Sequence, residues 1–245
     1  LHTQFSLLDG AIKLGDLIER ATQYEMPAVA ITDHGNMFGA IKFYKAAKRA
    51  GIKPIVGSEV YVAPLGRKDR TARRSFHLIL LAKDLEGYRN LCRLSSLGFM
   101  EGFYYVPRVD WELLQAHSKG LICTTACLGG ELAQAILKGD PDHALRTAKQ
   151  YDELFGRGSY YLELQHNGYP EQERVNEELL NISELTGIPV VATNDCHYLD
   201  QDHADAHEVL MAIQTGKKMD AEDRLSHDAQ ELYFKSPQIM SEQFK

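Results

Sequence analysis

The stretch AVAITDHGNMFGAIKFYKAAKRAG, residues 28–51, contains the pattern that decides the fold. Its first residues are apolar and rich in β-branched side chains, which predicts a short buried strand. After the polar segment at 33–36, apolar residues recur at helical spacing up to residue 50, and Gly51 stands where a helix usually ends. The stretch therefore predicts one strand and one helix, with polar side chains at the turn between them.

The same order of strand and helix recurs along the chain. Apolar runs predict strands at 53–63, 76–82, 120–125, 160–165 and 189–193, and amphipathic runs predict helices at 85–100, 131–138, 142–154, 172–186 and 204–215. Such alternation is typical of parallel strands joined by right-handed crossovers. With one more strand at the N-terminus there are about seven such units, which favours a TIM-like, seven-stranded β/α barrel over a two-layer sheet.

The predicted barrel occupies residues 1–216. Residues 217–245 carry a weaker strand pattern at 231–235 and a last helix from 237, and we expect them to extend the same domain toward a following one. The chain begins at Leu1 and His2 without a start methionine, so we expect it to be part of a longer protein.

Composition excludes several classes of protein. With 44% hydrophobic residues among 245, the chain forms a sizeable core and is not disordered. A formal net charge of -7 argues against a protein that coats nucleic acid through bulk charge. The sequence has no apolar run of about 18 residues and no signal peptide, so no membrane partner is expected. The four cysteines form no CxxC pair, which predicts a cytoplasmic location.

Metal-ligand side chains lie at the ends of nearly all predicted strands, where the functional groups of β/α barrels are found. They are His2, Asp9, His34, Glu59, His77, Cys127, Asp195 and His197. Single residues have simpler explanations, since Asp195 is able to cap a turn and Cys127 to be a small buried apolar residue. Asp33 is either a helix N-cap or a group that orients a neighbouring imidazole. The set as a whole indicates a shared metal site.

The mixture of ligand types indicates the chemistry. Imidazoles bind zinc and similar ions, carboxylates bridge ions and offset their charge, and a thiolate favours zinc over magnesium. Two or three ions close together grip a phosphate and generate hydroxide from water at neutral pH. We therefore expect two or three divalent ions, zinc first, with manganese, iron or magnesium as alternatives, and hydrolysis of phosphate esters.

A basic segment, GRKDRTARR at 66–74, lies between Glu59 and His77 in the sequence. We expect it to rim the metal mouth and to guide a DNA backbone toward the metals. The candidate DNA contacts are Arg67, Lys68, Arg70, Arg73, Arg74 and, further along the chain, Arg108. A solvated loop, or a surface that docks onto another domain, explains the same charges.

Six motifs carry a resemblance to a known family. They are LHTQFSLLDG at 1–10, AITDHGNMFGAIKFY at 30–44, GIKPIVGSEVYV at 51–62, FHLILLAKD at 76–84, TTACLGGEL at 124–132 and ATNDCHYL at 192–199. They resemble the PHP (polymerase and histidinol phosphatase) domain, in the version at the N-terminus of bacterial replicative DNA polymerase III alpha subunits. The resemblance runs the whole length of the chain and implies a distorted seven-stranded β/α barrel.

The resemblance also implies a site and an activity. In this family nine ligands usually hold three metals, and the resemblance places eight of them at the eight residues named above. The ninth, the first His of an H-x-H pair, would directly precede Leu1. For members with a complete ligand set, the resemblance implies a 3′–5′ exonuclease that proofreads, or a related phosphoesterase. DNA synthesis would belong to polymerase domains that are absent here.

Two other functions stay open at this point. The first is a catalytically silent module in which metals brace the fold and the domain docks onto the polymerase or a partner. The second is a free-standing phosphatase of a small metabolite, against which the polymerase-type motifs speak. The expected partners are a DNA 3′ end, the remaining domains of a polymerase alpha subunit and other replisome subunits.

Overall fold

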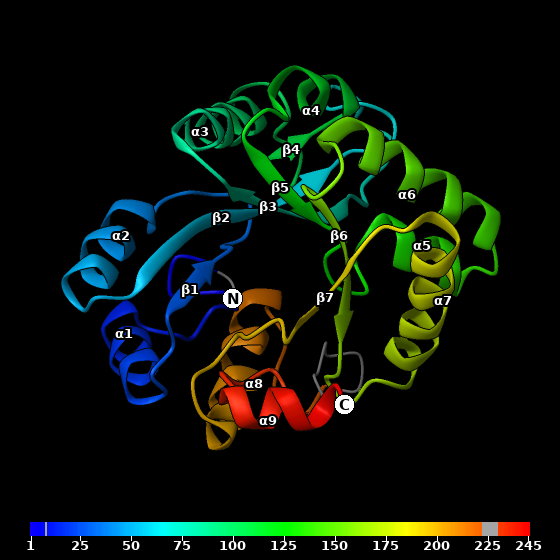
Figure 1. Ribbon diagram of the computed structural model, residues 1–245. Helices are drawn as coiled ribbons and strands as arrows, with labels where there is room; N and C mark the ends of the chain where they lie inside the picture. Colours follow the sequence, from blue (N-terminus) through cyan, green and yellow to red (C-terminus); the bar gives the residue numbers. More distant parts are fainter. Residues whose placement is uncertain (8, 222–229) are drawn as a thin grey trace.

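The computed structural model describes residues 1–7, 9–221 and 230–245. Its centre is a mixed sheet that curls into a half-barrel (Figure 1). In the order in which they pair, the strands are β1 (Ala28–Ile31), β2 (Lys53–Val62), β3 (Phe76–Ala82), β5 (Leu121–Thr124), β6 (Tyr160–Gln165) and β7 (Val190–Thr193), with the short β4 (Arg108–Val109) beside β2. The predicted α/β class and barrel-like curvature are confirmed.

Helices cover the outer side of the curved sheet, and the last two lie at its open side (Figure 1). They are α1 (Leu14–Gln23), α2 (Ala40–Arg49), α3 (Leu85–Met100), α4 (Trp111–His117), α5 (Glu131–Leu137), α6 (Pro141–Phe155), α7 (Pro170–Thr186), the 3-10 turn η1 (Gln201–His203), α8 (Ala204–Thr215) and α9 (Pro237–Gln243). The sequence-based prediction missed α1, β4 and α4. For α1 the signal is present in the sequence, because its buried residues Leu14, Leu17, Ile18 and Ala21 recur at helical spacing. None of the helices described has the length and apolar content to cross a membrane.

Strand β3 corrects the prediction of an all-parallel sheet. It runs antiparallel to both of its neighbours, β2 and β5, whereas the other pairs in the sheet are parallel. The physical reason lies in residues 63–75, which form no helix, so the chain turns back instead of crossing over. As a result His77, at the start of β3, pairs with Tyr61 near the end of β2. The start of β3 therefore lies at the edge where the other strands end.

The N-terminal segment joins the two ends of the sheet at this edge. The backbone N–H of Thr32, after β1, donates to the carbonyl of Leu1 at 2.9 Å, and the N–H of His2 donates to Cys196, after β7, at 2.8 Å. The described N-terminal residues make only an isolated bridge between Thr3 and Ile12, so the N-terminal strand that was predicted is not formed there.

The predicted extension, 217–245, is described except for residues 222–229. Its strand pattern at 231–235 yields only an isolated bridge between Tyr198 and Tyr233, so the predicted strand is wrong. The segment nevertheless packs against the barrel, because Phe234 is buried in the cluster formed by α1, α2 and β1. In the view of Figure 1, α8 and α9 lie at the open side of the sheet between β1 and β7.

One close approach holds α3 against the sheet. Gly87, in the first turn of α3, lies so near Gly120 that a Cβ at residue 87 would be 1.7 Å from the Gly120 carbonyl oxygen. The contacting oxygen belongs to the backbone, so it is not able to rotate away as a side chain would. A methyl group at this position therefore displaces the helix from β5.

We expect Gly87→Ala to lower the free energy of unfolding by about 2–4 kcal/mol, because the helix has to shift or the backbone has to strain. Gly15→Ala is the matched control, since a Cβ at this helical glycine in α1 meets no atom within 4 Å. It should raise stability by up to about 1 kcal/mol through helix propensity. Urea denaturation measures both, and equal effects of the two substitutions would contradict this packing.

Candidate metal centre

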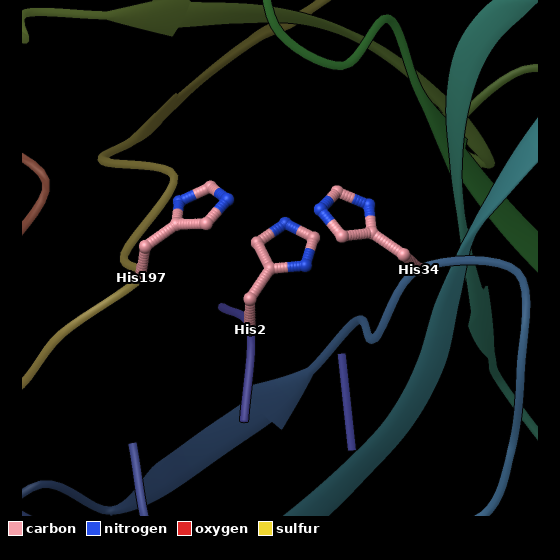
Figure 2. A group of neighbouring side chains, drawn as sticks. All are labelled: His2, His34 and His197. Atoms are coloured by element: carbon pink, nitrogen blue, oxygen red, sulfur yellow. The ribbon is translucent and has the colours of Figure 1, made fainter. Parts of the chain in front are cut away.

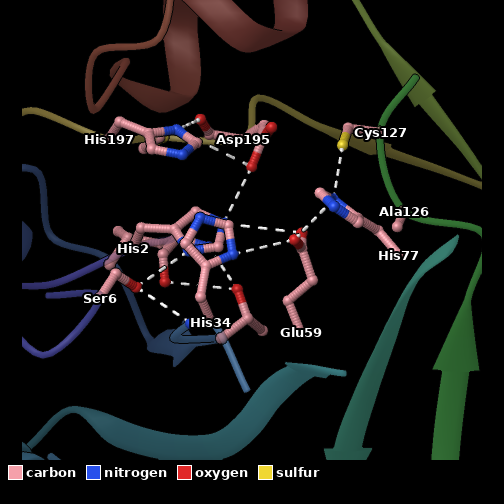
Figure 3. Close-up of polar contacts among 12 residues, drawn as sticks. His2, Ser6, His34, Glu59, His77, Ala126, Cys127, Asp195 and His197 are labelled. Atoms are coloured by element: carbon pink, nitrogen blue, oxygen red, sulfur yellow. Dashed lines mark hydrogen bonds and ion pairs between the residues drawn. The ribbon is translucent and has the colours of Figure 1, made fainter. Parts of the chain in front are cut away.

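The predicted ligand side chains converge at the strand-end edge of the half-barrel (Figure 3). Three groups have ligand atoms that all lie within 4.8 Å of one another: His2, His34 and His197; Glu59, His77 and Cys127; and His2, Glu59 and Asp195. Asp9 joins them through His34, since its Oδ2 lies 3.1 Å from the His34 Nε2. The structure thus brings together all eight side chains that the sequence analysis selected.

Three imidazole rings form one side of the site, and Figure 2 shows them side by side. The His2 ring centroid lies 4.0 Å from that of His34 and 4.3 Å from that of His197. His2 comes from the N-terminal segment, His34 follows β1 and His197 follows β7. Burial and the two neighbouring histidines lower the pKa of His2 to about 3, so this ring is neutral near pH 7. A neutral imidazole is the form that binds a metal.

Glu59, on β2, links the histidines to the other side of the site. Its Oε1 lies 3.0 Å from the His34 Nδ1 and 2.8 Å from the His77 Nδ1, and its Oε2 lies 3.7 Å from the His2 Nε2. The Cys127 Sγ is 3.5 Å from the same His77 nitrogen. Cys127 follows β5, so this group joins residues from β2, β3 and the segment after β5.

Asp195 completes the cluster beside His2. Its Oδ1 lies 3.1 Å from the His2 Nε2, while its own carbonyl contacts the His197 Nδ1 at 2.7 Å. Asp195 has a backbone φ of 49°, in the left-handed region that non-glycine residues rarely adopt. Strained backbone of this kind gathers at functional sites, where the surrounding structure holds it in place.

Buried ligand-type atoms without a hydrogen bond show that the residues fit a divalent cation. Asp9 Oδ1, His34 Nδ1 and Glu59 Oε1 are buried and make no hydrogen bond. The two atoms of the His34–Glu59 contact are only 3.0 Å apart, yet their geometry is not that of a hydrogen bond. Buried polar atoms are nearly always satisfied, so ligand-type atoms that converge without hydrogen bonds are arranged as metal ligands are.

In the metal-free protein several of these groups hold protons. Burial lowers the pKa of His34, but Glu59 and Asp9 outweigh it and raise the value to about 10. For His77, burial also acts downward and Glu59 raises the pKa to about 8. Burial, with the charges of Asp195 and Glu59, raises the pKa of the Cys127 thiol well above its usual range. A bound cation reverses these preferences, because its charge favours deprotonated ligands.

Among the described residues, the Asp33 carboxylate hydrogen-bonds to the N-terminal segment and not to the ring of its neighbour His34. Its carboxylate accepts hydrogen bonds from the Thr3 N–H at 2.6 Å and from the Ser6 hydroxyl at 3.0 Å. Ser6 in turn contacts the His2 Nδ1 at 3.1 Å. This chain of contacts orients the His2 ring, and the importance of Ser6 is visible only in the folded chain.

Two of the predicted DNA contacts are structural, which corrects the prediction for them. Arg108 is fully buried, and its guanidinium donates to the backbone carbonyls of residues 67, 69, 72 and 102. Arg67 is 9% exposed and forms ion pairs with Glu101, Asp110 and Glu112. The irregular connection before β3 is therefore tied to the rest of the fold by these two arginines.

The other basic residues of this connection, Lys68, Arg70, Arg73 and Arg74, are exposed. Arg73 and Arg74 line a groove of about 680 Å³, together with Gln134 and Lys138 from the region of α5. None of the described residues that line the groove is acidic. Gly129, also in its wall, packs against the His77 ring, because a Cβ there would be 2.9 Å from the His77 Nδ1. The groove therefore lies beside His77, and Lys138 is a cation that the sequence analysis missed.

Comparison with known proteins decides the family. The PHP domain family matches residues 1–167, which is more than half of the chain. The chain belongs to the PHP domain family. This PHP domain is similar to part of the proteins named DNA polymerase III subunit alpha, with 48% identity over 250 residues in Deinococcus radiodurans and 47% over 246 residues in Thermus aquaticus. In Borreliella burgdorferi the identity to the same subunit is 46% over 248 residues.

These alignments take in nearly all of the PHP domain chain but only a fraction of each relative. They cover 98%, 98% and 100% of this chain, and 19%, 20% and 22% of the relatives in the same order. The chain thus spans about a fifth of the length of the curated relatives that it matches. Among solved structures, an amidohydrolase from Chromobacterium violaceum with bound SO4 and no metal has a similar fold. It is 14% identical, with a TM-score of 0.50, and the alignment covers 80% of this chain and 85% of that chain.

We expect metal binding to release protons, because His34, His77 and Cys127 hold protons near pH 7 in the metal-free protein and ligate only after losing them. The apparent affinity for zinc should rise between about pH 6 and pH 9, and the His77 contribution should level off above its pKa. Calorimetry in buffers of different ionisation enthalpy counts the protons. Cys127→Ser is the matched control and should release about one proton fewer; equal heats in all buffers would argue against this ligand set.

Proposed function

We propose that this PHP domain hydrolyses phosphodiesters with two or three bound divalent ions, as a 3′–5′ exonuclease that acts on a DNA 3′ end. One observation carries the proposal: His, Asp, Glu and Cys side chains from several strand ends converge in one buried cluster, in which Asp9 Oδ1, His34 Nδ1 and Glu59 Oε1 make no hydrogen bond. Many ligands so close together suit a cluster of ions, and such clusters act on phosphate esters.

We assign the ions to the three groups of side chains. His2, His34 and His197, with Asp9, form a nitrogen-rich group, whereas Glu59, His77 and Cys127 include a thiolate. The thiolate and the imidazoles favour zinc, with manganese, iron or magnesium as alternatives. When bound, such ions supply positive charge that neutralises a phosphate and a nucleophile from water at neutral pH.

The chain's own residues hold and shield this site. Glu59 is 1% exposed and His2 is fully buried, so the inner ligands are screened from bulk water, which strengthens electrostatic interactions there. The Asp33–Ser6 contact fixes the His2 ring. Tyr61 lies beside the site with its ring centroid 5.3 Å from that of His77, and burial raises the pKa of its hydroxyl, which stays protonated. These residues position the ligand side chains and keep bulk water from them. Because the ions supply the nucleophile from water, no protein nucleophile is required.

The basic groove is the path that we assign to the DNA strand. Arg73, Arg74 and Lys138 line it, and Lys68 and Arg70 lie exposed on the same connection. The Arg73 guanidinium carbon lies 4.3 Å from the centroid of the Tyr105 ring, which is 60% exposed. Proteins that bind single strands typically combine two features: cations that follow the phosphate backbone and an exposed aromatic ring on which a base stacks.

A second role, docking onto the remaining domains of a polymerase alpha subunit, is supported by a different surface. Phe38, Phe99, Met100 and Phe103 are 57%, 40%, 78% and 52% exposed. The Phe99 ring lies 6.1 Å from both the Phe38 and the Phe103 rings, so these three exposed rings are contiguous. Exposed apolar patches usually mark an interface.

Contacts with other replisome subunits and a cytoplasmic location remain predictions. A free-standing phosphatase of a small metabolite is not favoured, because the relatives are polymerase subunits.

Nucleotide release from a 3′-mismatched primer tests the exonuclease. The domain, with a His placed before Leu1, should shorten the primer from its 3′ end when loaded with zinc or manganese. Asp9→Asn should lower the rate by about 100-fold or more, because it removes a ligand. Lys119→Gln, at the opposite end of β5 from Cys127, is the control and should not change the rate. Stoichiometric metal binding without nucleotide release, with Asp9→Asn lowering only the melting temperature, would leave docking as the role of the domain.

Oligonucleotide binding tests the groove. The double variant Arg74→Gln with Lys138→Gln should weaken binding of a labelled single strand, because phosphate contacts are lost. The slope of log affinity against log salt concentration should become shallower by about 0.7 for each contact removed. Fluorescence anisotropy across a salt series measures both quantities, with Lys119→Gln again as the control. An unchanged slope in the double variant would exclude the groove as the DNA path.

A further inference from the structure

A second buried carboxylate, Glu163, lies on β6 behind the metal centre. It is 5% exposed and belongs to none of the ligand groups among the described residues. The sequence shows it in the strand pattern YYLELQ, where a carboxylate among apolar residues is unexpected. Burying a carboxylate is costly unless it is paired or hydrogen-bonded, so this position requires a reason.

Hydrogen bonds to both carboxylate oxygens supply that reason. Oε2 accepts from the Thr124 hydroxyl and from the Ala126 backbone N–H at 3.1 Å. Oε1 accepts from the Thr193 hydroxyl at 2.5 Å and from the Gln165 side-chain amide at 3.1 Å. The four donors come from three different strand ends, so one side chain ties β5 and β7 to β6 between them.

Each of the two neighbouring strands leads directly into a metal-ligand candidate. Ala126 precedes Cys127, and Thr193 stands two residues before Asp195. Figure 3 shows Ala126 at the base of the loop that carries the Cys127 thiol toward His77. Glu163 therefore contacts the backbone or side chains of the segments that present both ligands, without touching either ligand.

The backbone of these segments is strained in a way that needs such support. Ala126 has a φ of 61° and Asp195 a φ of 49°, both in the left-handed region. For residues with a Cβ this conformation costs about 1–2 kcal/mol, and it persists only where neighbours enforce it. The hydrogen bond from the Ala126 N–H to Glu163 is one such constraint, and it acts on the residue that sets the direction of the Cys127 side chain.

We propose that Glu163 is a positioning residue, which holds the Ala126–Cys127 turn and the end of β7 so that Cys127 and Asp195 meet the same metal cluster. The proposal rests on the metal centre described under the proposed function. It assigns Glu163 neither a bond to a metal nor a part in the chemistry. Support for ligand side chains of this kind typically changes metal affinity by about 10–100-fold.

Glutamine and alanine at position 163 separate hydrogen bonding from charge and from stability. A glutamine keeps the shape and can turn its oxygen toward the Ala126 N–H, while its NH2 faces the Thr193 hydroxyl and a rotated Gln165 amide. Alanine removes every one of these acceptors. Glu163→Gln should therefore stay close to the wild-type protein, and Glu163→Ala should release the turn before Cys127.

Cobalt(II) titration followed by absorption reads out the thiolate directly, because a thiolate bound to cobalt absorbs in the near ultraviolet. Cys127→Ser should abolish this band and so assign it. Glu163→Ala should lose most of the band and at least about tenfold in cobalt affinity, whereas Glu163→Gln should keep the band and stay within about threefold of the wild-type affinity. Leu179→Ala, a core change on α7 with Leu179 2% exposed in the wild-type protein, is the stability control and should keep the band.

The outcomes distinguish the two levels of the proposal. A wild-type protein that shows no cobalt–thiolate band overturns the metal centre and the role of Glu163 with it. Three results would each overturn the positioning role alone. They are a normal band in Glu163→Ala, a loss of the band in Glu163→Gln as large as in Glu163→Ala, and a loss of the band in Leu179→Ala. A band that follows the expected pattern in a protein without nuclease activity would support the role of Glu163 and overturn only the proposed exonuclease.

Discussion

The buried carboxylate of Glu59 is the contact on which the centre depends. At 1% exposure it would be strongly unfavourable alone, and it is held by His77 at 2.8 Å, His34 at 3.0 Å and His2 at 3.7 Å. These histidines come from β3, from the turn after β1 and from the N-terminal segment. A single side chain on β2 thus requires three distant parts of the chain to meet, and their meeting defines the mouth of the half-barrel.

The direction of β3 makes this meeting possible. Residues 63–75 return the chain without a helix, so β3 enters the sheet antiparallel and presents His77 at its start. Two buried arginines hold this return: Arg108 donates to carbonyls of the connection, and Arg67 pairs with carboxylates outside it, among them Asp110. The same connection then exposes Arg73 and Arg74 along the groove beside His77. One irregular segment therefore serves the fold through its buried Arg67 and through the carbonyls that it presents to Arg108, and it offers its exposed arginines to a ligand.

Hydrogen-bonded carboxylates behind the ligands form an outer layer of this architecture. Asp33 orders Thr3 and Ser6 and so supports His2, while Glu163 joins the ends of β5 and β7 near Cys127 and Asp195. Both are buried, and both act through a neighbour and not on a ligand ring directly. The strained φ angles at Ala126 and Asp195 lie where this layer meets the ligands. Precise placement of the ligands thus depends on groups that carry no ligand chemistry themselves.

The sequence alone determined the residue types of the site and most of the elements that carry them. Buried strands and amphipathic helices have periodic patterns that are local, and a His, Asp, Glu or Cys directly beside a strand is visible without coordinates. The ligand set was selected on this basis, and the folded chain brings its members together. The missed α1 also had a local signal, whereas β4 is only two residues long and too short for any pattern.

Only the tertiary structure decided the direction of β3, which charged side chains are buried and which groups they contact. Whether β3 runs parallel or antiparallel depends on pairing with β2 and β5, which lie on either side of it in the sheet and not in one sequence window. An arginine in a basic run looks the same whether it faces solvent, as Arg74 does, or is buried, as Arg67 is, until the carboxylates around it are placed. Glu163 likewise acquires its meaning from donors on β5 and β7. Local patterns follow from side-chain chemistry, but these features arise from contacts between segments far apart in the chain, which only folding brings together.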